Sequence, residues 1–378
     1  MAALSEEQSI IRDQAKNWVS SEAPVQKFRQ VRDTQEPLNY APDTWAAMAE
    51  MGWPGILVPE AHGGSDLGYL TFGLILEETG RQLTASPLFA SAYAAATALI
   101  KTGNEAQQAK YLPQIADGSV VATLALDEGT RHNPKRLATM ATANDAGFVI
   151  SGQKSFVMEA QAANLFVVSA RTSGAETDVD GQSLFLLSAD ADGVEVDRLA
   201  TVDSRGFANV NFNDVQVSSD DLLGEAGACA PQIETILDCC RAGIAAEMLG
   251  TASQAFEMTL EYLKTREQFG RVIGSFQALG HRAATLFTQM ELARSCVEAA
   301  LKAVDEDSDE LPRLASLAKC RMGDFLHEMS NQLIQIHGGI GMTDEFDAGF
   351  YLKRARVLEA AFGNQGYHRD RYARLQGF

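Results

Sequence analysis

The stretch "TREQFGRVIGSFQALGHR", residues 265–282, interrupts two long helical patterns with a short, basic, aromatic loop. Before it, apolar residues recur every four positions over 244–256, which predicts a helix with one apolar face. After it, a second helix is expected over about 276–304. The acidic stretch 305–312 predicts a turn, and a third helix follows and ends in glycines. The C-terminal part is therefore expected to be a bundle of long helices.

Three arginines cluster in this loop, although the chain carries a formal net charge of −19. They are Arg266, Arg271 and Arg282. A guanidinium is rigid and always charged, so it suits a phosphate. Phe269 and Gly270 predict a tight turn with an aromatic side chain. An ordinary helix–helix turn with solvated arginines is the alternative that composition leaves open.

Two later stretches also have features of a ligand site. In "QIHGGIGMTDEF", residues 335–346, the glycines allow the backbone to approach a ligand closely. Gln335 lies just before them and can both donate and accept hydrogen bonds. A helix terminus is the alternative interpretation of the glycines. "RVLEAAFGNQGYHRD", residues 356–370, follows 21–35 residues after Gln335.

The order of hydrophobic patterns predicts the domain organisation. Residues 1–119 show helical patterns, and 120–228 hold six short Val/Phe/Leu-rich runs that predict an antiparallel sheet. Residues 229–378 are helical again. The order of helices, then sheet, then helices is not a βαβ alternation, so a Rossmann domain is excluded and an α+β fold is expected.

Composition excludes several function classes. The net charge of −19 argues against nucleic acid and anionic membrane surfaces as partners. No apolar run reaches the roughly 18–20 residues that a membrane span needs. The five cysteines and six histidines show no metal-ligand spacing, so no metal site is expected. The N-terminus lacks the basic start and apolar core of a signal peptide, and a cytoplasmic location is expected.

In order and spacing, these stretches resemble the acyl-CoA dehydrogenase family. The two most specific signatures are R-x-Q-F-G-x-x-I-x-x-F-Q at 266–277 and Q-x-x-G-G-x-G at 335–341. "GWPGILVPEAHGGSDL" and "KYLPQIADGSVVATLAL" in the first half, and "GFVISGQKSF" and "VNFNDVQVSSDDLLGE" in the sheet region, extend the similarity over nearly the whole chain. The resemblance implies an N-terminal helical domain, a middle antiparallel β domain and a C-terminal four-helix bundle.

The resemblance also implies FAD, an acyl-CoA substrate and α,β-dehydrogenation of the thioester. In this family a carboxylate removes the α-proton while the β-hydrogen leaves as a hydride to the flavin. The pyrophosphate and adenosine end of FAD is held by residues that reach across a subunit interface to the neighbour's flavin. By analogy these are Arg266, Gln268, Phe269, Gln277, Gln335 and Gly339, which we call the lending set.

The chain departs from the family at both known positions of the catalytic base. Phe362 stands where the final loop normally carries a Glu, and a phenyl ring cannot take a proton. Cys240, just before Arg241, stands at the other base position, and a thiol is a poor substitute for a carboxylate. No catalytic residue is therefore predicted. Arg241 is a candidate substrate residue that faces the CoA, although neutralising a buried carboxylate is an equal alternative.

The flavin-ring contacts of the sheet domain are altered as well. The family's T-E-P-x-x-G-S-D is "DEGTRHN" here, over 127–133, and its Arg131 and His132 are foreign to that motif. Met158 replaces a hydroxyl residue that meets the flavin ring. In the last loop Asn364 replaces a Thr, and Gly366 replaces a Gln that contacts the cofactor.

These losses fall on one set of residues and spare the other. The residues with which a subunit of this family contacts its own flavin ring and performs the reaction are replaced here, whereas the residues of the lending set are unchanged. The pattern predicts the non-catalytic subunit of a heteromeric enzyme, a heterotetramer with two copies of each subunit. Bacterial relatives of this kind act on CoA esters of steroid side chains, and electron-transfer flavoprotein is a further expected partner. The alternatives are a homo-oligomeric flavoenzyme with an atypical base, for which Glu359 is the nearest carboxylate, and a flavin-free acyl-CoA-binding protein.

Overall fold

The computed structural model describes residues 4–378, and the contacts within it divide the chain into two compact units. The helical unit contains the chain up to Arg29, Tyr69–Thr84 and Arg241–Phe378. The mixed unit contains Gln30–Gly68 and Ala85–Cys240. Each unit is described by itself. The predicted division into domains 1–119, 120–228 and 229–378 remains a prediction.

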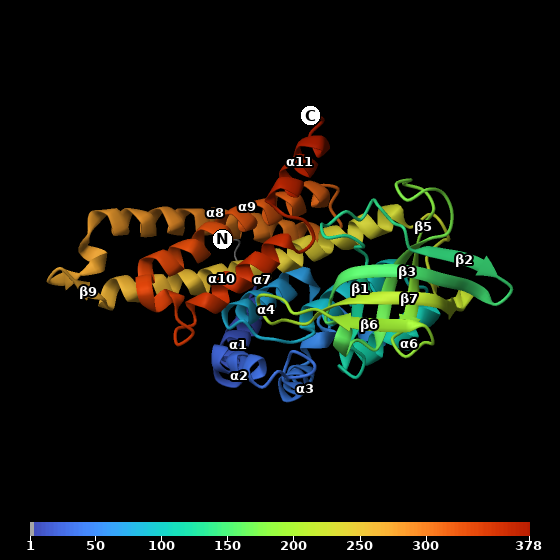
Figure 1. The fold of residues 1–378 in the computed structure, drawn as a ribbon, viewed down its shortest axis with the longest axis horizontal. Coiled ribbons are helices and arrows are strands. Elements are labelled where there is room, and N and C mark those ends of the chain that lie inside the picture. Colours follow the sequence, from blue (N-terminus) through green and yellow to red (C-terminus); the bar gives the residue numbers. More distant parts are fainter. Residues whose placement is uncertain (1–3) are drawn as a thin grey trace. The chain divides into compact units, whose positions relative to one another are not determined.

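The helical unit is built mainly from long helices, as the periodicity predicts. Its helices are α1 (Glu6–Glu22), α4 (Gly68–Arg81), α8 (Gln277–Asp305), α9 (Leu311–His337), α10 (Ala348–Ala360) and α11 (Gln365–Leu375), with α2 (Val25–Asp33) and α7 (Ala230–Thr265) crossing its boundary. In Figure 1, α8 and α9 run side by side, and α9 also contacts α10 and α11. The predicted turn at 305–312 is confirmed, because α8 ends and α9 begins within it.

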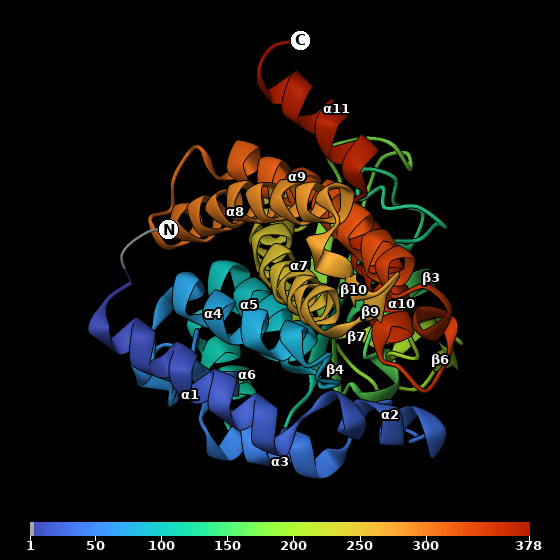
Figure 2. The ribbon, with the colours of Figure 1, turned by 90° about the vertical axis from the view of Figure 1, so that its left-hand side faces the viewer.

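Two glycines bring α4 and α7 into backbone contact inside this unit. A Cβ atom on Gly80 would clash with the carbonyl oxygen of Glu247, and one on Gly250 would clash with that of Glu77. Neither glycine has a positive φ, so close approach rather than turn geometry requires them. The reciprocal arrangement fixes the register of the two helices, which can be seen beside each other in Figure 2.

The mixed unit holds an eight-stranded sheet in the order β6-β7-β3-β2-β4-β5-β8, with β1 paired to β4. Its strands are β1 (Ala122–Ala125), β2 (Met140–Asn144), β3 (Gly147–Met158), β4 (Leu165–Arg171), β5 (Gln182–Ser188), β6 (Val194–Arg198), β7 (Phe207–Val217) and β8 (Leu222–Leu223). Phe166, Phe185 and Phe212 are at most 2% exposed and belong to one apolar cluster. This core covers the sheet that the alternating patterns predict.

The sheet differs from the prediction in two respects. β1 and β2 each pair with β4 in parallel, so the sheet is mixed, although all other pairs are antiparallel. β2 was not predicted, because only Ala141 of its five residues is buried and its sequence "MATAN" has no apolar pattern. Two parallel strands must be joined by a long connection, so they are distant in the sequence. Local periodicity therefore does not indicate that they pair.

Short helices complete the mixed unit. They are α3 (Pro42–Glu50), α5 (Ala96–Thr102) and α6 (Glu105–Ala116), together with the π-helical turn η3 (Leu88–Ala95). η3 leads directly into α5. Among residues 4–378, no helix is both long and apolar enough to cross a membrane.

Candidate functional site

The loop between α7 and α8 is a small hairpin of β9 (Glu267–Gln268) and β10 (Arg271–Val272). Phe269 and Gly270 form its turn with φ angles of +53° and +74°. Two positive φ values fit a two-residue hairpin turn, but a large aromatic residue is unfavourable at the first position. Phe269 is nevertheless 92% exposed. The predicted tight turn is confirmed, and it displays its aromatic ring to solvent.

Local contacts hold this hairpin in shape. The Arg271 guanidinium lies 4.0 Å from the centre of the Phe276 ring, and the Phe269 ring meets Phe276 edge-on at 6.2 Å. The Ile273 amide donates a 2.8 Å hydrogen bond to the carbonyl of Arg266. Arg271 therefore supports the hairpin, whereas Arg266 leaves its side chain open.

The polar members of the lending set have few partners within residues 4–378. The side chains of Arg266, Gln277 and Gln335 are exposed, and none forms a hydrogen bond or ion pair in that part of the chain. The Gln268 amide bonds only the carbonyl of its neighbour Glu267, at 2.9 Å. Gly339 has open space where a Cβ atom would stand. Donors, acceptors and bare backbone are thus available to a ligand on this surface.

The Phe362 loop, residues 361–364, joins α10 to α11. Phe362 has a φ of +54° and is half-buried, and Gly363 follows with a φ of +105°. Asn364 caps α11 by accepting a 2.9 Å hydrogen bond from the amide of Tyr367. The loop is well formed around an apolar residue.

Arg241 binds this loop from α7. Its Nε donates to the Phe362 carbonyl at 3.4 Å, and its Nη2 donates to the Tyr367 hydroxyl at 3.2 Å. The imidazole Nε2 of His368 also lies 3.0 Å from that carbonyl. Arg241 is 0% exposed. Its structural role is to position the loop, and its contact with a substrate remains a prediction.

A buried lysine that the sequence did not single out holds the same loop. Lys319 Nζ donates to the carbonyls of Leu358, Glu359 and Gly363, at 2.9, 3.2 and 3.1 Å. Burial lowers the pKa of Lys319 to about 7, while the charge of Glu359 opposes the shift. The only sequence signal was a lysine inside the apolar stripe of α9, where a charged side chain is unusual.

Glu359, the nearest carboxylate to the Phe362 loop in sequence, is already engaged. Arg356 Nη1 lies 2.5 Å from Oε1, and His327 Nδ1 lies 3.1 Å from Oε2. Both carboxylate oxygens of Glu359 are therefore occupied by partners within the chain. Cys240, at the second base position, is 0% exposed.

In the mixed unit, the altered flavin-contact stretches are bonded to each other. Lys154 Nζ lies 2.6 Å from Glu128 Oε1, and it also bonds Ser169 Oγ at 3.1 Å. Burial lowers the pKa of Lys154 to about 8, against the charge of Glu128. Burial opposes ionisation of Glu128, but Lys154 and the backbone amides outweigh it and lower its pKa. This ion pair joins the loop after β1 to β3.

His132, one of the residues foreign to the motif, has a defined place. Its Nδ1 lies 2.7 Å from Asp127 Oδ2, and its side chain is 4% exposed. The Ser155 hydroxyl donates to the carbonyl of Glu128 at 3.2 Å. Phe156 is 52% exposed with a φ of +52°. His132, Lys154 and Ser155 are therefore committed to internal contacts, whereas Arg131 and Phe156 are exposed.

The described residues contain no cluster of His, Cys, Asp or Glu that would hold a metal ion. Within residues 4–378 the cysteines form no disulfide bond. His281 is exposed on α8. His337 ends α9 and is buried, with the Tyr262 and Phe346 ring centroids 4.2 and 4.7 Å from its own.

The two parts of the predicted site in the helical unit lie far apart. Arg241 lies within α7 and Arg266 directly follows its last residue, Thr265, so a rise of about 1.5 Å per residue separates them by roughly 36 Å. The hairpin therefore does not meet the Phe362 loop of its own chain.

Comparison with known proteins identifies the family. The acyl-CoA dehydrogenase N-terminal, middle and C-terminal domain families match residues 5–119, 122–215 and 230–376. The chain belongs to the acyl-CoA dehydrogenase family. It is 30% identical to the probable acyl-CoA dehydrogenase YngJ of Bacillus subtilis, over 97% of each chain.

Among solved acyl-CoA dehydrogenase-like structures, two similar ones carry paired names. The Tcur3481-Tcur3483 steroid ACAD has 29% identity and a TM-score of 0.89, with 98% of each chain covered. The ChsE4-ChsE5 complex of Mycobacterium tuberculosis has 25% identity and a TM-score of 0.90, covering 99% of this chain and 98% of that one. The predicted fold class is confirmed.

FAD is the cofactor of this acyl-CoA dehydrogenase-family chain, as predicted. The open guanidinium of Arg266, the amides of Gln277 and Gln335, and the uncovered backbone at Gly339 fit its phosphates and adenosine. The flavin-contact stretches of the mixed unit present fewer free groups, because His132, Lys154 and Ser155 bond within the unit.

Proposed function

We propose that this chain is the non-catalytic subunit of a heteromeric, FAD-dependent acyl-CoA dehydrogenase. It lends Arg266, Gln268, Phe269, Gln277, Gln335 and Gly339 to the flavin of a related catalytic subunit, and that subunit supplies the glutamate. The reaction is the α,β-dehydrogenation of a CoA thioester, for which FAD supplies the two-electron acceptor.

The observation that carries this proposal is the contrast between open and committed side chains. Arg266, Gln277 and Gln335 have no partner within residues 4–378. Lys154 and His132 are bound to Glu128 and Asp127 inside their own unit. A surface that keeps unpaired donors and acceptors exposed is suited to a ligand outside the chain.

The absence of a base at both family positions supports the same division of roles. The α-proton of a thioester is weakly acidic, so its removal needs a carboxylate with a tuned pKa. Phe362 and Cys240 do not supply one. The loop around Phe362 is still bound by Arg241, Lys319 and His368. It therefore keeps its conformation although it carries no base. The roughly 36 Å between Arg241 and Arg266 places the lending set away from that loop.

The similar structures suggest the assembly and the substrate class. The ChsE4-ChsE5 structure is a complex of two named chains, and the Tcur3481-Tcur3483 protein is a steroid ACAD. We extend both properties to this chain as proposals. The partner is then a related subunit in a heterotetramer, and the acyl group is a bulky one such as a steroid side chain.

The deciding experiment is purification of the chain alone and together with a related subunit that carries the catalytic glutamate. Flavin absorbance and acyl-CoA oxidation are expected only in the joint complex. Stoichiometric FAD and acyl-CoA oxidation by the lone chain would instead favour a homo-oligomeric enzyme. Absence of flavin from every complex would favour a flavin-free acyl-CoA-binding protein.

A substitution at Glu359 distinguishes the proposed function from a homo-oligomeric enzyme with an atypical base. If Glu359 were an atypical base, Glu359→Gln would abolish activity. Because its carboxylate is held by Arg356 and His327, we expect turnover of the joint complex to stay within about twofold.

A further inference from the structure

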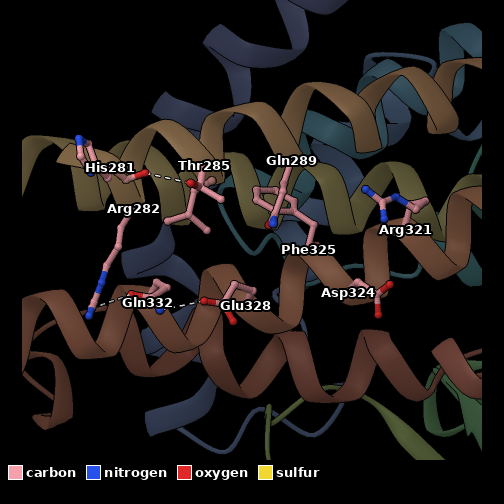
Figure 3. Close-up of a pocket in the computed structure, with 10 residues that line it drawn as sticks. His281, Arg282, Thr285, Gln289, Arg321, Asp324, Phe325, Glu328 and Gln332 are labelled. Atoms are coloured by element: carbon pink, nitrogen blue, oxygen red, sulfur yellow. Dashed lines mark hydrogen bonds between the residues drawn. The ribbon is translucent and has the colours of Figure 1, made fainter. Parts of the chain in front are cut away.

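A polar groove of about 440 Å³ lies between α8 and α9 in the helical unit. Figure 3 shows its two walls. His281, Arg282 and Gln289 come from α8, and Arg321, Asp324 and Glu328 come from α9. Phe325 and Leu286 add apolar surface. The side chains that line this groove do not take part in holding the hairpin or the Phe362 loop described above.

The acidic groups of the groove are already neutralised or bonded by neighbouring side chains. Arg369 Nη2 from α11 lies 2.6 Å from both carboxylate oxygens of Asp324. The Gln332 amide donates to Glu328 Oε1 at 2.8 Å. Asp324 is therefore charge-compensated, whereas Glu328 is hydrogen-bonded but keeps its charge.

The basic and amide groups are open. Within residues 4–378, the side chains of Arg321, Gln289 and His281 form no hydrogen bond or ion pair. Arg282 has one weak contact, from Nη1 to Gln332 Oε1 at 3.5 Å. With Asp324 paired to Arg369, the two guanidinium groups of the groove outnumber its one remaining carboxylate, that of Glu328. This balance favours an anion, and the planar fork of an arginine suits a carboxylate.

The groove is continuous with the lending set. On α8, Gln277 precedes His281 by one helical turn, and on α9, Gln332 precedes Gln335 by nearly one turn. Leu292, which is 53% exposed, continues the same face of α8 beyond Gln289. A neighbouring subunit that offers its flavin to the lending set would therefore meet this groove as well.

We propose that the groove is a docking site for a carboxylate-bearing segment of the related subunit, bound between Arg282 and Arg321. This inference rests on the proposed function, because it names a second contact of the same partner. Arginine and aromatic residues are enriched in protein interfaces, and the groove presents Arg282, Arg321 and Phe325. The contact fixes the register of the two subunits, and the lending set holds the cofactor.

A zero-length cross-link tests the occupant directly. Arg321→Lys keeps the charge and introduces a primary amine, which a carbodiimide couples only to a carboxylate in contact. In the joint complex we expect an amide link from position 321 to an Asp or Glu of the related subunit, identified by mass spectrometry. Lys353, an exposed lysine on α10 with no partner within residues 4–378, is the matched native control and should give no such link.

Charge reversal gives the energetic test. Arg321→Glu should weaken assembly by about tenfold or more in a titration followed by light scattering, because a like charge then faces the carboxylate. Lys353→Gln should leave the dissociation constant unchanged. Circular dichroism and melting temperature show that each variant is folded. Unchanged assembly of Arg321→Glu, or an intact complex without a link at position 321, overturns the proposal.

The two proposals fail in different ways. Arg266→Gln should reduce FAD content while assembly persists, whereas Arg321→Glu should reduce assembly itself. A complex that forms the link but never holds flavin would refute the proposed function and leave the docking site standing. A chain that assembles only with itself, with the link between two copies, refutes the related subunit as the occupant.

Discussion

Lys319 Nζ donates a 3.1 Å hydrogen bond to the carbonyl oxygen of Gly363, the residue after Phe362. The same ammonium group binds the carbonyls of Leu358 and Glu359 at the end of α10. Buried Lys319 on α9 therefore binds both the end of α10 and the loop around Phe362. A cation near a helix C-terminus is favourable, and here it provides partners for carbonyl groups that the helix leaves unpaired.

Lys319→Met should lower the free energy of unfolding by about 2–4 kcal/mol. The change removes the ammonium group that binds three carbonyls, and a buried acceptor left without a partner costs about 1–3 kcal/mol, partly offset because a buried charge is removed as well. Urea denaturation followed by circular dichroism measures the effect. Lys353→Met, at an exposed position of α10, is the control and should change stability by less than about 0.5 kcal/mol. Equal stabilities of the two variants would contradict the role of Lys319.

Phe362→Leu should leave the turnover of the joint complex within about twofold of the wild type. Phe362 carries no ionisable group, and replacing one apolar side chain with a similar one usually costs less than about 1.5 kcal/mol. Steady-state assays with a bulky acyl-CoA give the comparison. Removal of the related subunit's glutamate is the positive control, because loss of a general base lowers rates by about 10²–10⁴-fold. A comparable fall with Phe362→Leu would show that this loop takes part in the reaction.

The features that the sequence predicted well are those that local residues determine. The hairpin depends on Phe269 and Gly270 together, and the long helices depend on apolar spacing of three and four residues. β2 was missed because its pairing with β3 uses backbone groups and almost no apolar side chain. Periodicity does not report such pairing.

The sequence provided a list of candidate site residues, which stays a prediction, but it did not indicate the bonds among them. Lys319 meets carbonyls 39–44 residues further along the chain, which no local pattern indicates. The same holds for Arg241, whose contact with Phe362 spans 121 residues. Resemblance to the family located the missing glutamate, and only the structure showed which side chains are open and which are bonded.

Arg266→Gln should weaken FAD binding by the joint complex about 10–100-fold. A hydrogen bond to a charged group contributes about 1.5–3 kcal/mol, and Arg266 has no partner within residues 4–378 that would compensate. Flavin released on dilution, followed by fluorescence, measures the affinity. Lys264→Gln, an exposed cation two residues earlier, is the matched control and should bind FAD normally. Equal affinities for both variants would place the phosphates elsewhere.

Titration of Glu78 should account for much of the change in the protein's stability with pH. Burial raises the pKa of Glu78 to about 7, and Arg81, Lys16 and Arg12 only partly oppose the shift. Since the folded pKa lies above the ordinary value of 4.5, the neutral carboxyl stabilises the fold at low pH. That contribution is full below about pH 4.5 and is lost as the pH rises through 7. Its size follows from the shift and is about 3 kcal/mol.

Glu78→Gln should remove this dependence, because an amide does not titrate. The wild type should lose about 2–3 kcal/mol relative to the variant between pH 5 and pH 8, measured by urea denaturation at each pH. Glu257→Gln is the matched control: it removes another carboxylate that pairs with Arg81, but its side chain is 56% exposed. Its stability difference from the wild type should stay nearly constant over the same range. A constant difference for Glu78→Gln as well would show that Glu78 is ionised throughout.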